Sequence, residues 1–289
     1  MIKQITIALV YLLLLVPTVN AEKKLGPVAG FAKSMYDNWS RGEPLPHISI
    51  KIPSVTDQQA AIAQLMFVQH RLKSNSEVEI SGFKAGLTSK IGQKKFNVNG
   101  PISGVLFVSG KVDNGGEVSL ADYRKLMLET EIGFILGQDI DTPVNDVQQL
   151  KSKVSAILPV IEMPNLALAD LKNITGQDIV ASNAIANRYL LGETINIPVS
   201  FSLNQIKTSL VHSYDSTPMT VNQGSGSDAL GDQWQALLWL VNERLASGHH
   251  LRRGQFLITG ALGKMIPAKK GEYAADFGPL GQITFTVTE

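Results

Sequence analysis

Three glutamates in apolar surroundings are the residues of this chain whose types and spacing point most directly to chemistry. Glu129 and Glu131 flank one threonine in the run KLMLETEIGFILG, and Glu162 follows the apolar run ILPVI. An unpaired charge inside an apolar interior costs several kcal/mol or more, and a divalent cation would compensate all three carboxylates. The sequence therefore predicts a metal site at these glutamates. The alternative for Glu129 and Glu131 is the solvated face of a half-exposed strand.

Strand geometry explains how the first two acids would cooperate. Side chains at positions i and i+2 of a strand point the same way, about 6.6 Å apart, so Glu129 and Glu131 are expected to share one face and Thr130 to occupy the other. Carboxylates so placed raise each other's pKa unless a cation lies between them. Oxygen ligands favour Mg²⁺ or Mn²⁺, with Ca²⁺ possible. Three carboxylates leave about three of the six positions around Mg²⁺ for water or substrate.

A lysine in a glycine frame lies upstream of the acids. Lys84 stands between Gly82 and Gly86 in the run SGFKAGLTS, and glycines let a backbone bend sharply or approach a ligand closely. Lys84 would then be a cation for a carboxylate ligand or, if partly desolvated, a base; a surface lysine in a turn is the alternative. The adjacent His249 and His250 lack spaced partners, so no metal site is predicted there.

The spacing of apolar residues predicts the helices and strands that hold these side chains. Helical spacing of apolar residues predicts a helix over 57–73, with Asp57 as its N-cap, and another that Asp232 opens and Gly248 ends. Strands are expected at residues 77–84, 104–109, 128–136 and 283–288, whereas 154–161 fits a strand or the end of a helix. Few helices among many short strands predict an α+β fold around a strongly bent sheet.

The first residues and the composition bound the class of protein. Lys3, an apolar stretch over 5–16 and the small-residue pattern Val19-Asn20-Ala21 predict a signal peptide at residues 1–21. We therefore expect a periplasmic or secreted protein, with an uncleaved anchor as the alternative. A lead segment is expected at 22–56, with a short helix around residues 30–39, and one domain at 57–289. The net charge of +1 argues against nucleic-acid binding, and the absence of cysteine excludes disulfides and thiolate metal sites.

Taken together, these runs resemble the 2-keto-4-pentenoate hydratase branch of the fumarylacetoacetate hydrolase superfamily. The resemblance covers most of the chain after Asp57. The matching runs are GFKAGLTSKIGQKKFNVNGPISGVLF (82–107), LETEIGFILGQDI (128–140), PVIEMPN (159–165), DIVASNAIANRYLLG (178–192), GSGSDALGDQWQALLWLVNERLASGHHLRRGQFLITGALG (224–263) and AADFGPLGQITFTV (274–287).

The resemblance implies a fumarylacetoacetate-hydrolase-like, highly bent mixed β-sheet (a β-roll) with flanking helices. It implies a divalent metal on Glu129, Glu131 and Glu162, Lys84 as the catalytic lysine, and substrate contacts from the segments that carry Ser182, Asn183 and Gly260. It further implies a homo-oligomer and a lyase that hydrates a small 2-oxo acid or 2-hydroxydienoate. Decarboxylation or C–C hydrolysis of a 2-oxo acid, or binding of a metal and carboxylate without turnover, are the alternatives.

The chain departs from the family pattern near the expected substrate. Ile102 stands where the family often carries an acid, and the run Ser182-Asn183-Ala184-Ile185 replaces the frequent Asp-Asn-Ala-Ser. Ala261 likewise stands where the family often has a serine. These changes leave the predicted metal ligands intact and point to a different substrate or to slow turnover.

Overall fold

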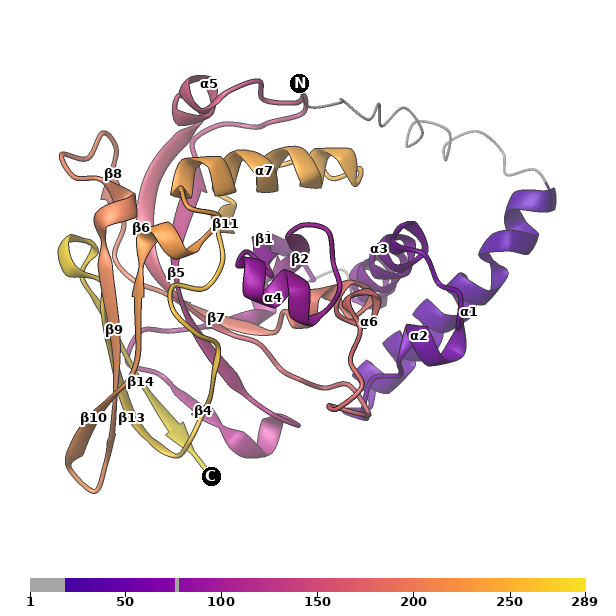
Figure 1. Ribbon diagram of the computed structural model, residues 1–289, viewed down its shortest axis with the longest axis horizontal. Coiled ribbons are helices and arrows are strands. Elements are labelled where there is room, and N and C mark those ends of the chain that lie inside the picture. The colour runs from indigo at the N-terminus through magenta and orange to yellow at the C-terminus, as the bar shows by residue number, and fades with distance from the viewer. Residues whose placement is uncertain (1–18, 76–77) are drawn as a thin grey trace.

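The computed structural model describes residues 19–75 and 78–289 (Figure 1). Residues 1–18 of the expected signal peptide lie outside these ranges. The largest feature is a curled mixed sheet in the strand order β2-β1-β11-β5-β6-β7-β3, with β12 paired to β5 and β8 paired to β6. Its strands are β1 (Ile80–Gly86), β2 (Ile102–Phe107), β3 (Lys111–Val112), β5 (Met127–Leu136), β6 (Val154–Met163), β7 (Arg188–Leu191), β8 (Ile195–Asn196), β11 (Phe256–Ile258) and β12 (Ile266–Pro267).

The long hairpin of β5 and β6 occupies the middle of this sheet. The two strands pair antiparallel, with Ile132 opposite Pro159 and Phe134 opposite Ile157. Nearly all of their side chains are buried, which explains why β6 reads as a continuous apolar run that could also have been a helix end. The segment 154–161, left open by the sequence, is therefore a strand.

A second sheet curls beside the first in the order β10-β9-β13-β14-β4. Alternating burial along β14 matches the alternation of its sequence, with apolar side chains facing the core. The segment around 209–221 folds as a hairpin that turns at Asp215 and Ser216, which both have positive φ. The strands are β4 (Glu117–Ser119), β9 (Lys207–Tyr214), β10 (Thr217–Ser225), β13 (Gly271–Asp276) and β14 (Gln282–Thr288).

Helices flank the sheets, with α7 along one side of the curled sheet and α1, α2, α3 and α6 gathered at one end of the molecule (Figure 1). One apolar core joins both sheets to α7, through residues such as Phe134, Leu210, Leu240 and Phe285. The helices are α1 (Val19–Ser40), α2 (Ile48–Lys51), α3 (Asp57–Ser74), α4 (Lys90–Lys95), α5 (Val147–Lys151), α6 (Gly176–Ala181) and α7 (Gln233–Ala246).

The helix ends correct one expectation and confirm another. The N-cap of α3 is Thr56 and not Asp57, because the Thr56 hydroxyl accepts from the Gln59 amide while the Gln59 side chain accepts from the Thr56 amide. Asp57 becomes the first helical residue. Asp232 caps α7 as predicted, since its carboxylate accepts from the Gln235 amide.

The lead segment is more helical than its sequence suggested and packs on the remainder of the chain. α1 extends well beyond the short helix expected at 30–39. Its residues Val28, Phe31 and Met35 are buried in an apolar cluster with Phe67 of α3 and Leu168. Lead segment and domain thus share one of the cores.

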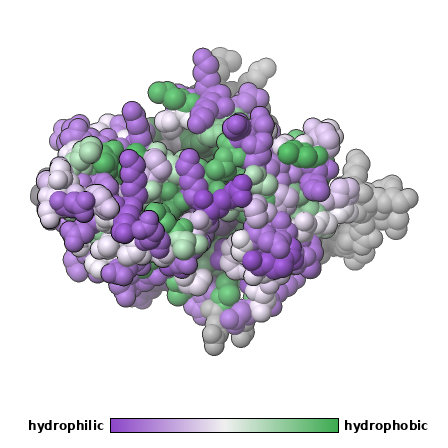
Figure 2. Space-filling view, turned by 90° about the horizontal axis from the view of Figure 1, so that it is seen from below, coloured by the Kyte–Doolittle hydropathy of each residue, from purple (hydrophilic) through white to green (hydrophobic). Residues whose placement is uncertain are grey.

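The outer surface is mostly hydrophilic on the face seen in Figure 2, with apolar side chains visible toward the middle of the molecule. Within residues 19–75 and 78–289, no helix combines the length and the apolar character needed to cross a membrane.

Candidate active site

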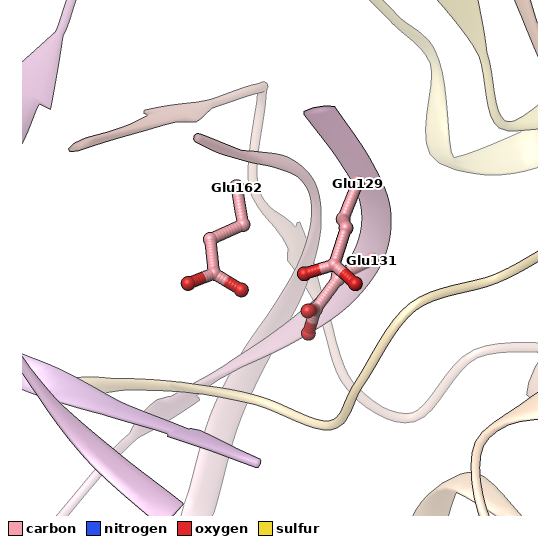
Figure 3. A group of neighbouring side chains, drawn as sticks. All are labelled: Glu129, Glu131 and Glu162. Atoms are coloured by element: carbon pink, nitrogen blue, oxygen red, sulfur yellow. The ribbon is translucent and has the colours of Figure 1, made fainter. Parts of the chain in front are cut away.

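The β5–β6 hairpin brings the three glutamates together. Glu129 of β5 lies directly opposite Glu162 of β6 in the strand register, and Glu131 follows two residues later. All three carboxylates point into the same space, from two adjacent strands (Figure 3). Thr130 faces away, where its hydroxyl donates to the carbonyl of Leu262 at 2.9 Å. One carboxylate oxygen from each glutamate lies within 4.8 Å of the others.

The acids are buried, and burial dominates their electrostatics. Glu131 and Glu162 are 0% exposed, and Glu129 is half-buried. Burial raises the pKa of Glu129 to about 8, with Lys84 lowering it and Glu162 raising it further. Burial and the charges of Glu162 and Glu129 raise the pKa of Glu131 well above its usual range. The site therefore favours protons or a cation over bare negative charge.

Lys84 provides one such cation. Its Nζ lies 2.6 Å from Glu162 Oε1, and its side chain is 3% exposed. Strand β1 positions it, because Lys84 pairs with Ile258 of β11 on one side and Gly104 of β2 on the other. Burial alone would lower the pKa of Lys84, but the charges of the three glutamates raise it. Of the two roles open to this lysine from the sequence, the geometry favours the fixed cation over the neutral base.

A count of hydrogen-bond donors shows that the carboxylates are incompletely satisfied. The Gly260 amide donates to Glu131 Oε2 at 2.7 Å. Within the described part of the chain, neither Glu131 Oε1 nor Glu162 Oε2 has a donor, although both atoms are buried. Buried carboxylate oxygens are ordinarily paired because an unmet one carries its full desolvation cost. A hard divalent ion fits this donor set of oxygen atoms on a shared face.

Only glycine fits the backbone conformation and the space available at position 260. Its φ is +110°, and a Cβ there would collide with the side chain of Thr88. The backbone amide of Gly260 is already used by Glu131, so this glycine positions a carboxylate. Its predicted substrate contact stays a prediction.

Ser182 and Asn183 lie next to the site on the turn that follows α6. The Ser182 hydroxyl donates to the carbonyl of Ile179 at 3.1 Å. The Asn183 side chain accepts from the Val105 amide and donates to the Val105 carbonyl, both at 2.8 Å. Its amide group therefore holds the turn against β2, one residue from the strand partner of Lys84. The predicted substrate contacts of both residues stay predictions.

This turn has an unusual backbone. Asn183, Ala184 and Ile185 all have φ between +52° and +60°, a conformation that is costly for residues other than glycine and most of all for a β-branched side chain. The turn passes so close to Gly104 that a Cβ there would lie 2.6 Å from the Asn183 carbonyl oxygen. Only Asn183, a residue type that tolerates positive φ, indicated this backbone conformation in the sequence.

The position where the family often has an acid is apolar in structure as well as in sequence. Ile102 is buried with Ile179 and Ala184, and Leu87 and Phe96 pack against them. Gly86 of β1, two residues from Lys84, pairs with Ile102. The histidine pair lies elsewhere: His250 contacts Asp141 at 2.8 Å on the surface, and His249 packs on Phe83.

Comparison with known proteins identifies the family. No family model matches the chain. The 2-keto-4-pentenoate hydratase of Paraburkholderia xenovorans LB400 is 31% identical over 241 residues, covering 83% of this chain and 87% of the relative. The chain belongs to the 2-keto-4-pentenoate hydratase family. Two further relatives of this family are the TodF product hydratase of Pseudomonas putida F1, at 32% identity over 79% of this chain and 84% of that one, and the 2-hydroxyhexa-2,4-dienoate hydratase of Comamonas testosteroni, at 28% over 82% and 88%.

Solved structures confirm the expected fold of this family member, the fumarylacetoacetate-hydrolase-like curled sheet with flanking helices. The 4-oxalocrotonate decarboxylase from Pseudomonas putida G7, complexed with magnesium and adipate, superposes with a TM-score of 0.82 at 20% identity over 91% of this chain and 97% of that one. A second structure of that decarboxylase, with calcium and acetate, gives 0.80. A Yersinia pestis CO92 protein described as of the fumarylacetoacetate hydrolase family gives 0.53 at 11% identity, over 71% and 91%.

Proposed function

We propose that this protein is a divalent-metal-dependent hydratase that adds water to a small 2-hydroxydienoate, the enol form of a 2-oxo acid. The observation that carries the proposal is the buried constellation of Glu129, Glu131 and Glu162 beside Lys84, in a chain whose relatives are named as hydratases of such acids. The proposed roles are metal ligands for the glutamates and a catalytic cation for Lys84.

The reaction requires a proton transfer followed by addition of water. A proton added at carbon 5, together with loss of the proton from the 2-hydroxyl group, converts the dienol into a conjugated 2-oxo-3-enoate. Water then adds its oxygen at carbon 4 and a proton at carbon 3, which gives a 4-hydroxy-2-oxo acid. Mg²⁺ or Mn²⁺, when bound, supplies a Lewis acid for the carboxylate and 2-oxygen of such a substrate.

The chain's own residues would prepare this chemistry. Gly260 fixes one oxygen of Glu131, and Lys84 fixes one oxygen of Glu162, so two of the ligands are held in place before substrate arrives. The protonated Nζ of Lys84 is the buried cation nearest these carboxylates, and it would neutralise the substrate carboxylate or hand over a proton at that atom. The apolar cluster around Ile102 would exclude water from the same side.

The test is loss of dienoate absorbance with 2-hydroxypenta-2,4-dienoate as substrate and added Mg²⁺. We expect turnover by the wild type and a fall of about 10²–10⁴-fold in Lys84→Met, with a comparable or larger fall in Glu129→Gln. Lys73→Met, a change at the end of α3, is the matched control. Equal rates in Lys84→Met and wild type would refute the proposal. Identification of the product separates hydration from decarboxylation and C–C cleavage, and tight binding without turnover would make the protein a carboxylate-binding member of the fold.

We further propose that the protein is exported and acts in the periplasm or outside the cell. Among the α1 side chains whose burial is described, residues 26–40, the buried ones begin at Val28, so cleavage after Ala21 would leave all of these in place. N-terminal sequencing of the protein from its native host is expected to start at Glu22. A mature protein that retains residues 1–21 would contradict export by cleavage.

We also propose a homo-oligomer, with no membrane attachment after cleavage and a small carboxylate as its binding partner. Exposed apolar side chains such as Ile50, Ile91 and Met219 support this assembly. Light scattering coupled to size exclusion should give a mass that is a multiple of one mature chain. A mass of one chain at micromolar concentration would contradict the proposal.

A further inference from the structure

A buried arginine outside the glutamate site has no anionic partner among the residues that the structure describes. Arg71, in the last turn of α3, is 9% exposed. Its guanidinium lies between two rings, 4.1 Å from the centre of Trp39 and 3.7 Å from that of Phe107. Within residues 19–75 and 78–289, no carboxylate lies within 4.0 Å of it, and its Nε is buried without a hydrogen-bond partner. Burial lowers the pKa of Arg71 to about 10, which reflects a charge that its surroundings leave uncompensated.

The same arginine lines two neighbouring cavities. One has a volume of about 440 Å³ and the other of about 210 Å³, and Trp39, Arg71, Asp122 and Tyr123 border both. The larger lies between α1, α3 and the chain segments that follow β6 and α6. Neither is bordered by Lys84 or by any of the three glutamates. Most of the wall is thus built from helices and loops that the proposed hydratase chemistry does not use.

The polar groups around the cavities leave a surplus of positive charge. The two acids of the wall have partners of their own, because Asp122 lies 3.7 Å from Arg188 and Glu43 lies 2.8 Å from Arg41. Arg71 has none. The Tyr123 hydroxyl is likewise buried without a hydrogen-bond partner in the described chain.

Apolar side chains complete the wall of the larger cavity. Leu45 and Phe67 line it together with Trp39, so a ligand in this cavity would meet hydrocarbon as well as the Arg71 cation and the Tyr123 hydroxyl. This pairing of one charged contact with apolar walls is typical of sites for small organic acids. A guanidinium also presents its N–H groups in a fork that matches a carboxylate.

We propose that this cavity is a second ligand site, which binds a small organic carboxylate through Arg71 and Tyr123. The site is separate from the glutamate cluster, but it borders the turn at 182–185 that packs against β2. Ser182 and Ile185 border the larger cavity, and Asn183 between them holds β2 next to the strand partner of Lys84. The cavity that Arg71 borders therefore also reaches both ends of this turn.

The test uses hexanoate as the probe, with the full-length mature protein in EDTA so that no metal can recruit the acid to the glutamates. We expect one bound hexanoate per chain by calorimetry and a melting temperature raised by about 3–5 °C at ten times the dissociation constant. Arg71→Met should weaken binding at least tenfold. Arg253→Met, which removes an exposed arginine that borders neither cavity, should bind as the wild type does.

A second variant keeps the test decisive if Arg71→Met fails to fold. Tyr123→Phe removes only the unpartnered hydroxyl, and we expect it to weaken hexanoate binding several-fold with an unchanged melting temperature in the absence of ligand. Equal affinity of wild type, Arg71→Met and Tyr123→Phe would overturn the proposal. So would absence of hexanoate binding together with a smaller oligomer for Arg71→Met, since the anion would then be a side chain of another copy.

Discussion

Two buried acidic groups in this protein differ in how their oxygens are satisfied. Asp178 of α6 accepts from the Ser49 amide and hydroxyl and from the Thr175 amide and hydroxyl, at 2.8 to 3.0 Å. It also lies 3.1 Å from His47 Nδ1. Burial would raise its pKa, but these donors outweigh burial and lower it. This group binds the lead segment to α6.

Glu131 and Glu162 of the glutamate cluster are as buried as Asp178, but the cluster is short of hydrogen-bond donors. Burial raises the pKa of Glu129 and Glu131 there, and oxygens of Glu131 and Glu162 have no hydrogen-bond donor among the described residues. Burial of an acid therefore does not by itself indicate a ligand-binding site. A completed donor set marks a structural acid, whereas an incomplete one marks an acid held ready for a ligand.

The strongest test of this difference removes one carboxylate from the glutamate cluster. Glu131→Gln should lower kcat/KM by about a thousandfold or more, since several kcal/mol of transition-state stabilisation would be lost. The metal-free variant should unfold at the same temperature as the wild type or higher, because a buried acid that is costly to ionise is gone. Steady-state kinetics and thermal melts measure both, with the exposed Glu272→Gln as control. A variant that keeps its activity would remove Glu131 from the proposed metal site.

For Asp178, the structural acid, we expect a loss of stability without a loss of metal binding. Asp178→Asn should lower the free energy of unfolding by about 3 kcal/mol, because several buried donors lose their charged acceptor. Magnesium affinity per folded chain, measured by calorimetry, should not change. Asp113→Asn, at an exposed position, is the control. Lost magnesium binding without lost stability would show that the two acidic groups are not distinct.

The pH dependence of stability should separate the metal-free from the metal-loaded protein. With a pKa of about 8 against an ordinary value of 4.5, Glu129 holds a proton in the folded chain that the unfolded chain releases. Stability of the metal-free protein should therefore fall as pH rises from about 4.5 to about 8. Added Mg²⁺ displaces that proton, so the melting temperature of the loaded protein should exceed the metal-free value by more at pH 8 than at pH 6. A pH-independent difference would contradict the shifted titration.

The smallest effect on stability is expected when a single hydrogen-bond donor to Asp178 is removed. Ser49→Ala removes one hydroxyl from Asp178 and should cost about 1 kcal/mol in denaturant unfolding, with unchanged kcat/KM. Ser40→Ala, at the exposed end of α1, is the control. A large loss of activity in Ser49→Ala would mean that the lead segment acts directly on the reaction.

The sequence predicted the shared face of Glu129 and Glu131, because strand periodicity is local. It did not predict that Glu129 lies opposite Glu162, since pairing register depends on the whole hairpin. The contact of Lys84 with Glu162 also escaped prediction, because it joins strands separated by β11 and β5 in the sheet. Family resemblance supplied the association of these residues, and the structure supplied the distances.

Other parts of the site were hidden for identifiable reasons. Nothing in the sequence pairs the Asn183 amide with the Val105 backbone, since a buried asparagine and a substrate-binding one look alike. Arg71 reads as a cation at a helix C-terminus, which is an ordinary surface position. Its burial follows from α1, which brings Trp39 onto α3, and the sequence predicted that helix only in part.

The direct opposition of Glu129 and Glu162 has a consequence for the order of folding. Like charges directly opposite each other in an antiparallel pair disfavour the register that creates the site. Pairing of β5 with β6 is therefore not expected to begin at this end of the hairpin. The apolar pairs nearer the turn, such as Phe134 with Ile157, must set the register instead. We expect closure to run from the turn outward, so that the glutamates meet last, when a cation or protons are there to receive them.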